Sequence, residues 1–321
     1  MEIAAQLAVL VWSFKAGAPA DAPPVVADGR VFYAVADKKI YVVRLDDGKE
    51  LWSRRFRAPL PVTPVLEDEL VYQYVPYPEG YLYALRVADG KVAWRARAGP
   101  GVVCPAAGDG VVAVGRGDDA VFYDSLSGEE VARVKFDEAV VGAAYGGGGA
   151  FLVWTGGGRV AACRPGEAEP VWRTRVAASG VFGAVASGRA YLAAASGDVA
   201  CYDVSTGEEV WRDELNEPLA GAPVVAGDAL FVAGRRSVFA CSASGGEVLW
   251  TFNPGGNVVG VAAAGGRAVV ACEDGRLFAA SAQGSEELLR LDGYAAAAPA
   301  VAAGFLLAAD GENRLHCFKF E

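Results

Sequence analysis

The chain has little of what most catalytic and metal sites are built from. Its 321 residues include one histidine, one methionine, four asparagines and three glutamines. A single histidine excludes histidine-rich metal centres and leaves His316 as the one candidate base for a Ser-His-Asp triad. We expect His316 to be structural, and we predict no catalytic, cofactor-binding or metal-binding residue.

Basic residues are outnumbered, and long apolar runs are missing. The net charge of −10 argues against binding to nucleic acid phosphates. No apolar run reaches the roughly 18 residues of a membrane-spanning helix. Residues 3–12 are apolar but lack the basic start of a signal peptide, and we interpret them as a strand. We predict a cytoplasmic protein without a membrane span; an exported protein whose signal has been removed is the alternative.

The six cysteines stand singly, with no Cys-x-x-Cys and no adjacent pair. Each lies in an apolar run, which predicts small buried residues, with a disulfide as the alternative. Few amide side chains, together with many arginines, indicate a thermophilic source. High-GC coding would produce a similar bias.

The sequence does contain one recurring phrase, a glycine turn followed by a strand that carries tryptophan. Residues 46–52 read Asp-Asp-Gly-Lys-Glu-Leu-Trp, and Asp-Gly between apolar runs predicts a two-residue hairpin turn. The phrase recurs with steps of 38 to 42 residues, which indicates a repeat architecture. The tryptophan-equivalent positions are Trp12, Trp52, Trp94, Ala132, Trp172, Trp211, Trp250 and Leu289.

Each repeat is predicted to be a four-stranded antiparallel meander. In the first, turn residues separate apolar runs at 23–26, 31–35, 40–44 and 50–56. Such a sheet cannot bury both faces alone, so units of about 40 residues stack radially as propeller blades. The first strand is marked by a proline, as suits an unpaired inner edge; these prolines are Pro24, Pro64, Pro105, Pro223 and Pro299. The tryptophans predicted to dock one blade on the next are Trp12, Trp52, Trp94, Trp172, Trp211 and Trp250.

Counting the repeats gives eight blades. Residues 298–320 supply three strands of the last one, and residues 9–15 supply a fourth strand without a blade of its own. We therefore predict an all-β fold, an eight-bladed β-propeller of four-stranded antiparallel blades in a single domain over residues 1–321. The N-terminal strand joins the C-terminal blade and closes the ring.

With turn, glycine and tryptophan in register, the chain resembles the pyrroloquinoline-quinone-like (PQQ-like) repeat β-propeller family. The matching phrases are residues 83–86 with Gly90 and Trp94, and residues 201–203 with Gly207 and Trp211. The family spans quinoprotein dehydrogenases and non-catalytic members similar to an outer-membrane assembly scaffold. A dehydrogenase would imply a catalytic Asp, a Ca²⁺ ion held by Glu, Asn and Asp, and often a vicinal disulfide. None of these maps onto this sequence.

The second repeat departs most from the others, with five tyrosines and two prolines in residues 72–83. Tyrosine and arginine dominate the energetics of protein interfaces. We predict that a partner protein binds Arg54, Arg57, Tyr77, Tyr81 and Arg97. The alternative is that the tyrosines pack within the blade and leave only Tyr77 and Tyr81 exposed.

The resulting hypothesis is a non-catalytic propeller that acts as a rigid protein–protein interaction scaffold without a cofactor. It would be a monomer or a component of a larger complex. The alternatives are a quinone-dependent (PQQ) dehydrogenase and a propeller that binds a small ligand or glycan in its central channel.

Overall fold

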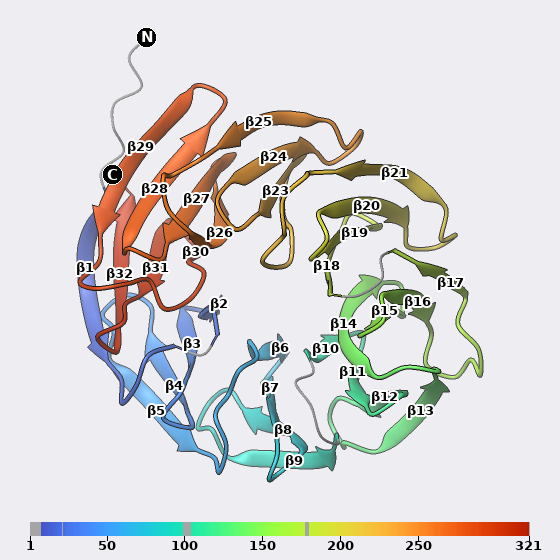
Figure 1. Cartoon of the computed structure of the whole chain (residues 1–321). Coiled ribbons are helices and arrows are strands. Elements are labelled where there is room, and N and C mark those ends of the chain that lie inside the picture. Colours follow the sequence, from blue (N-terminus) through green and yellow to red (C-terminus); the bar gives the residue numbers. More distant parts are fainter. Residues whose placement is uncertain (1–7, 21, 99–103, 177–179, 321) are drawn as a thin grey trace. The chain divides into compact units, whose positions relative to one another are not determined.

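The computed structural model describes residues 8–20, 22–98, 104–176 and 180–320, in which the regular elements are β-strands (Figure 1). The strands form eight antiparallel sheets of four strands each. The fold is an all-β, eight-bladed β-propeller, and the predicted fold class is confirmed.

The chain divides into two compact units of four blades each. The unit Met1–Arg55 and Val224–Glu321 holds blades 1, 6, 7 and 8. Blade 1 consists of β2 (Val25–Ala27), β3 (Arg30–Val35), β4 (Lys39–Arg44) and β5 (Glu50–Arg55). Blade 6 consists of β22 (Val224–Ala226), β23 (Ala229–Ala233), β24 (Val238–Ser242) and β25 (Val248–Phe252). Blade 7 consists of β26 (Val258–Ala264), β27 (Arg267–Cys272), β28 (Arg276–Ser281) and β29 (Gly284–Arg290). Blade 8 consists of β30 (Ala300–Ala302), β31 (Phe305–Ala309), β32 (Arg314–Phe320) and β1 (Ala8–Lys15).

The unit Phe56–Pro223 holds blades 2 to 5. Blade 2 consists of β6 (Val65–Glu67), β7 (Leu70–Val75), β8 (Tyr81–Arg86) and β9 (Val92–Arg97). Blade 3 consists of β10 (Ala106–Gly108), β11 (Val111–Arg116), β12 (Asp119–Asp124) and β13 (Glu130–Lys135). Blade 4 consists of β14 (Val140–Gly147), β15 (Ala150–Thr155), β16 (Arg159–Cys163) and β17 (Trp172–Arg175). Blade 5 consists of β18 (Val181–Ala186), β19 (Arg189–Ala194), β20 (Asp198–Asp203) and β21 (Glu209–Glu214).

Blade 8 is built from both ends of the chain. Its sheet runs in the order β1-β32-β31-β30, and Trp12 on β1 lies opposite Cys317 on β32. The predicted completion of the last blade by the N-terminal strand is therefore confirmed. Residues 3–7, which we expected to belong to the same strand, lie outside the described part of the chain.

Proline determines how long the first strand of a blade is. The five predicted prolines each stand immediately before a first strand of three residues, namely β2, β6, β10, β22 and β30. The three first strands that lack this proline, β14, β18 and β26, have eight, six and seven residues. Because proline has no N–H to donate, it ends the ladder at the inner edge.

The predicted two-residue turn between the third and fourth strands is wrong for blade 1. In blade 1 the loop has four residues, 45–48, because the N–H of Arg44 bonds the carbonyl of Lys49. The N–H of Gly48 also bonds the carbonyl of Arg44, and the Asp47 carboxylate accepts the N–H of Lys49 at 3.1 Å. Aspartate thus caps a wider turn that ends in a glycine with φ +68°.

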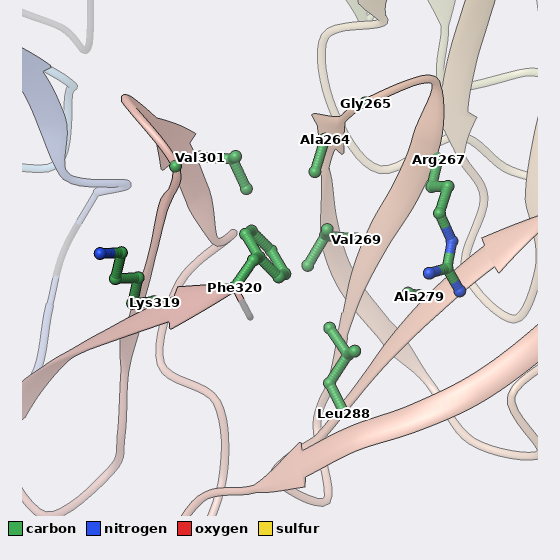
Figure 2. Close-up of a pocket in the computed structure, with 10 residues that line it drawn as sticks. Ala264, Gly265, Arg267, Val269, Ala279, Leu288, Val301, Lys319 and Phe320 are labelled. Atoms are coloured by element: carbon green, nitrogen blue, oxygen red, sulfur yellow. The ribbon is translucent and has the colours of Figure 1, made fainter. Parts of the chain in front are cut away.

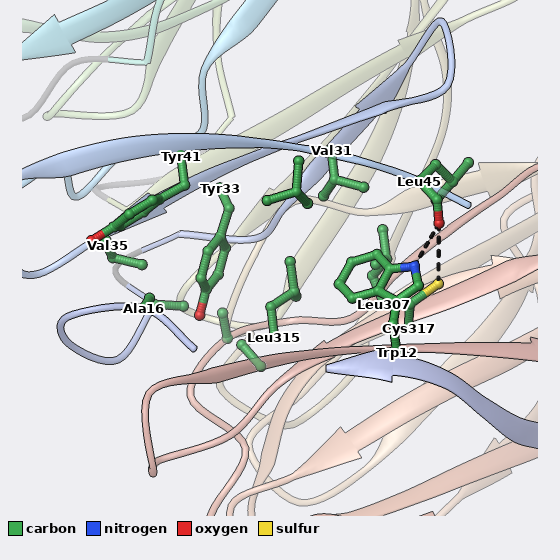
Figure 3. Close-up of a cluster of buried hydrophobic side chains, with 14 residues drawn as sticks. Trp12, Ala16, Val31, Tyr33, Val35, Tyr41, Leu45, Leu307, Leu315 and Cys317 are labelled. Carbon is green, nitrogen blue, oxygen red and sulfur yellow. Dashed lines mark hydrogen bonds between the residues drawn. The ribbon is translucent and has the colours of Figure 1, made fainter. Parts of the chain in front are cut away.

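The core lies between neighbouring blades. In the cluster shared by blades 8 and 1, Trp12 lies among Val31, Tyr33, Leu315 and Cys317 (Figure 3). The Trp12 indole N–H donates to the carbonyl of Leu45 at 2.6 Å. Within each compact unit, neighbouring blades therefore bury their facing surfaces against each other, as expected for a repeat that cannot bury them alone.

The same contact recurs between blades 2 and 3 and between blades 4 and 5. Trp94 donates to the carbonyl of Ser125 at 2.8 Å, and Trp172 to that of Val204 at 2.7 Å. The ring also covers the turn glycine, which is Gly48, Gly128 or Gly207. We call the indole, the carbonyl that it bonds and the glycine beneath it the tryptophan lock.

Replacing Gly128 by alanine should cost about 2–4 kcal/mol of unfolding free energy. The added methyl group would lie 2.5 Å from the Trp94 ring, and the backbone is held at φ +72°. Gly110→Ala is the matched control: its φ is +75°, and no atom lies within 4 Å of the added carbon. Urea denaturation followed by circular dichroism should show a loss of only about 1 kcal/mol for the control. Equal losses would show that the ring contact contributes nothing.

Blade 7 contradicts the predicted tryptophan register. In blade 2, Trp94 lies opposite Ala84, the fourth residue of β8. The fourth residue of β28 is Ala279, and it lies opposite Glu286, whereas Leu289 lies opposite Leu277. The physical reason is a shorter turn, because Ser281 pairs directly with Gly284.

Two kinds of side chain outside the repeat register are Trp154 and the six cysteines, and the cysteines follow the prediction with one exception. Trp154 is buried, with its ring against Gly142 and Gly183, and so is a packing residue. All six cysteines are free, and five are buried. Cys104 is exposed, which corrects the prediction for that residue.

Candidate protein-binding surface

The tyrosine-rich segment forms β7, β8 and the connection between them. Tyr72, Tyr74 and Tyr83 are buried in blade 2. Tyr77, in the connection, is 80% exposed, and Tyr81 is partly exposed. Packing within the blade therefore accounts for three of the five tyrosines, and two remain accessible.

Glu79 ties the connection to the rest of blade 2. Its carboxylate accepts the backbone N–H of Arg57 at 2.7 Å and the hydroxyl of Tyr83. Burial raises the pKa of Tyr83, and the bond to Glu79 raises it further, so the hydroxyl remains a donor. The Tyr83 ring meets Phe56 edge-on, with centroids 5.1 Å apart. Tyr77 is thus carried by a connection that Glu79 holds to the start of the unit and to β8.

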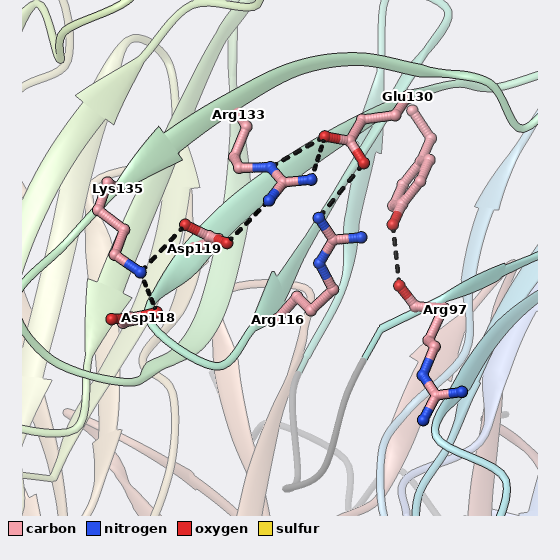
Figure 4. Close-up of polar contacts among 8 residues, drawn as sticks. Arg97, Arg116, Asp118, Asp119, Glu130, Arg133 and Lys135 are labelled. Atoms are coloured by element: carbon pink, nitrogen blue, oxygen red, sulfur yellow. Dashed lines mark hydrogen bonds and ion pairs between the residues drawn. The ribbon is translucent and has the colours of Figure 1, made fainter.

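Two arginines of β9 lie beside this connection. The Arg95 guanidinium lies over the Tyr81 ring, 4.9 Å from its centroid. Arg97 is paired with Tyr81 in the β-ladder, and its carbonyl accepts the Tyr123 hydroxyl at 3.0 Å. That bond anchors the backbone of Arg97 to blade 3 and leaves its guanidinium exposed (Figure 4).

The neighbouring cations of blade 3 are neutralised. Figure 4 shows Arg133 bonded to Glu130 at 2.7 Å and to Asp119 at 3.3 Å, and Lys135 bonded to Asp118 at 2.6 Å. Most arginines in the described part of the unit Phe56–Pro223 form similar ion pairs. Those with a carboxylate partner are Arg86, Arg116, Arg133, Arg159, Arg164, Arg173, Arg175, Arg189 and Arg212.

Three arginines in the described part of this unit form no ion pair, and all three adjoin the tyrosine connection. They are Arg57, Arg95 and Arg97. Together with Tyr77 and Tyr81 they form what we call the Tyr77 surface. Arg54, the remaining predicted residue, lies on β5 in the other unit, so it is not included in this surface.

Sequence reasoning missed the role of Glu79, which organises the connection. The signal was present, because a carboxylate four residues before Tyr83 is within reach of its hydroxyl across a tight turn. The sequence alone also does not indicate which arginines form ion pairs.

A second set of polar side chains contains the single histidine. His316 Nε2 lies 2.8 Å from the Asp310 carboxylate, and His316 Nδ1 lies 2.8 Å from the Ser13 hydroxyl. In a hydrolytic triad Nε2 faces the serine, and the hydroxyl is aimed at a bound substrate. Here Nδ1 faces Ser13, which is exposed on the outermost strand of blade 8. The contacts join β1 to β32, which supports the expected structural role.

The sequence of the chain matches the family model described as outer membrane protein assembly factor BamB. The matches cover residues 4–101, 78–175 and 156–319. The chain belongs to this family. The predicted resemblance to PQQ-like repeat propellers is therefore confirmed.

Solved structures agree with membership of the BamB family. BamB from Moraxella catarrhalis is 18% identical, with a TM-score of 0.79, and 98% of each chain is covered. The computationally designed protein Ika8 is 14% identical, with a TM-score of 0.82, covering 98% of this chain and all of the other. At these identities the likeness shows the fold alone. A search of curated proteins found no match.

In the described part of this BamB-family chain, no cluster of three or more His, Cys, Asp or Glu side chains is placed to hold a metal ion. The described residues also include no helix with the length and apolarity needed to cross a membrane.

Proposed function

We propose that the chain is a non-catalytic scaffold that binds an acidic protein partner through the Tyr77 surface. The observation that carries this proposal is that the three arginines of the unit Phe56–Pro223 without an ion pair adjoin the connection that carries Tyr77, the most exposed tyrosine of the described chain. A guanidinium without a carboxylate keeps its donors available for bidentate bonds to a partner's Asp or Glu.

The geometry suits a partner better than a small molecule. Tyr77 is 80% exposed, and the arginines are spread along β9 and the start of the unit, so the surface offers separate contacts over several residues. Because Glu79 holds the connection in place, little conformational freedom would be lost on binding. An assembly factor, as the family is described, works through contacts with other proteins.

Combining Tyr77→Ala with Arg57→Ala should reduce partner recovery about tenfold or more. The measurement is quantitative mass spectrometry after capture from a lysate of the source organism by the tagged full chain. Tyr294→Ala with Arg173→Ala is the matched control, since Tyr294 is 47% exposed and Arg173 is a surface arginine paired with Glu169. Both double variants should melt like the wild type. Equal recovery by the two would remove the Tyr77 surface from consideration.

The non-catalytic part of the proposal has its own test. Purified chain incubated with PQQ, Ca²⁺ and a dye acceptor should not oxidise alcohols or sugars. Turnover that depends on the added quinone would instead make the chain a dehydrogenase.

A further inference from the structure

The tryptophan lock has a donor half and an acceptor half. The donor is an indole opposite the fourth residue of the third strand, as with Trp94 opposite Ala84 and Trp172 opposite Ala162. The acceptor is the four-residue turn between the third and fourth strands of the next blade. Where both halves are present, they fill the space between two blades at this edge.

Between blades 7 and 8, both halves are missing. Glu286 stands where the indole would be, opposite Ala279. In blade 8 the third and fourth strands are β32 and β1, which come from opposite ends of the chain, so no hairpin turn joins them. Glu286 is turned toward Arg267, which it contacts at 2.7 Å, and it does not fill the gap.

A cavity of about 370 Å³ lies at this place (Figure 2). Its lining includes Ala279 itself, and apolar side chains from both blades surround it, among them Val269, Leu288, Val301 and Phe320. The volume lies within the range of small-molecule pockets, about 300–1,000 Å³. The Phe320 ring offers a face or edge for another aromatic ring.

The two cations of the cavity differ in what they contact. Arg267 is already paired with Glu286. Lys319, on the opposite side in Figure 2, is exposed and forms no ion pair within the described residues. Its side chain points away from the cavity, because neighbouring strand residues project to opposite faces: Cys317 packs toward blade 1, and Phe318 and Phe320 pack toward blade 7. An apolar cavity whose one inward cation is already paired suits a neutral apolar ligand.

We propose that this cavity binds a small neutral aromatic molecule whose ring occupies the place of the missing indole. Three other blade interfaces show what the space accepts, because there an indole from the chain itself fills it. The ligand's ring packs between Leu288 and Phe320. The site is independent of the Tyr77 surface and lies in the other compact unit.

Calorimetric titration of the full chain with indole tests the proposal. We expect a dissociation constant of about 1 mM or tighter, and weaker binding of indole-3-propionate, because the cavity offers its carboxylate no unpaired cation. Lys319→Ala and Lys49→Ala, which remove exposed lysines of blades 8 and 1, should change neither affinity. Absence of indole binding by the wild type, or tighter binding of the acid than of indole, would overturn the proposal.

A variant whose larger side chain fills the cavity tests whether the probes bind there. Leu288→Trp supplies an indole from the fourth strand of blade 7, so binding of both probes should be lost and the melting temperature should not fall. If Leu288→Trp does not fold, Val301→Phe fills the cavity from blade 8 and decides the question. Undiminished binding by a folded filled variant would show that the ligand sits elsewhere.

Discussion

Replacing Trp12 by alanine should lower the free energy of unfolding by about 3–5 kcal/mol. The indole is buried between blades 8 and 1, and its N–H is bonded to the carbonyl of Leu45. Truncation removes the packing of a large ring and leaves that carbonyl without its donor. The loss would be measured by urea denaturation followed by circular dichroism.

Trp12→Phe separates the contribution of ring packing from that of the indole N–H donor. It keeps an aromatic ring in place and removes the donor, so the loss should be about 1–2 kcal/mol. Trp250→Ala is a useful comparison. Trp250 is only half-buried, so its replacement should lower the free energy of unfolding by less. If Trp12→Ala unfolded at the same urea concentration as the wild type, the N-terminal strand would not hold blade 8 to blade 1.

Replacing Asp310 by alanine should also have a large effect and lower the free energy of unfolding by about 3–5 kcal/mol. The carboxylate is 0% exposed and accepts the N–H groups of Glu312 at 2.9 Å and Arg314 at 2.8 Å, as well as the His316 ring. Removing it leaves three part-buried donors without their acceptor, and the His316 ring that reaches Ser13 loses its support.

Asp137→Ala is the matched control for Asp310. Asp137 contacts Arg159 at 2.7 Å, but its side chain is 79% exposed, so the loss should be below about 1 kcal/mol. His316→Ala should lie between the two. A loss for Asp310→Ala no larger than that of Asp137→Ala would show that the Asp310 contacts do not stabilise blade 8.

These contacts explain how the two ends of the chain are held together in blade 8. The interface of blades 7 and 8 lacks the tryptophan lock, whereas the interface of blades 8 and 1 keeps it through Trp12. Asp310, His316 and Ser13 add cross-strand bonds within blade 8 itself. The terminal strand is therefore fixed by bonds to β32 and by its indole.

Repeat spacing predicted the fold well, because the recurring tryptophan and turn glycine take part in the same contact between two neighbouring blades. The strands expected at 31–35 and 40–44 are β3 and β4, each of which begins one residue earlier. The errors arose where turn length departs from the repeat. Blade 7 shortens its turn, which shifts Leu289 by two positions relative to the tryptophans, and spacing alone cannot reveal this.

The candidate site was predictable only in part. Tyrosine enrichment drew attention to the right blade, and Tyr77 is exposed there. Whether an arginine is neutralised depends on contacts distant in the sequence, such as Arg175 with Glu138 at 2.9 Å. Only the folded chain reveals that Arg57, Arg95 and Arg97 lack such contacts.

Photocrosslinking in cells of the source organism tests binding at the Tyr77 surface most directly. A benzophenone amino acid would replace Tyr77 in one variant and Tyr294 in another. We predict one discrete protein adduct from position 77, with crosslinked peptides rich in Asp and Glu, that is lost when Arg57→Ala is added and absent from position 294. No adduct at position 77, or the same adduct from both positions, would contradict a partner-binding role for the Tyr77 surface.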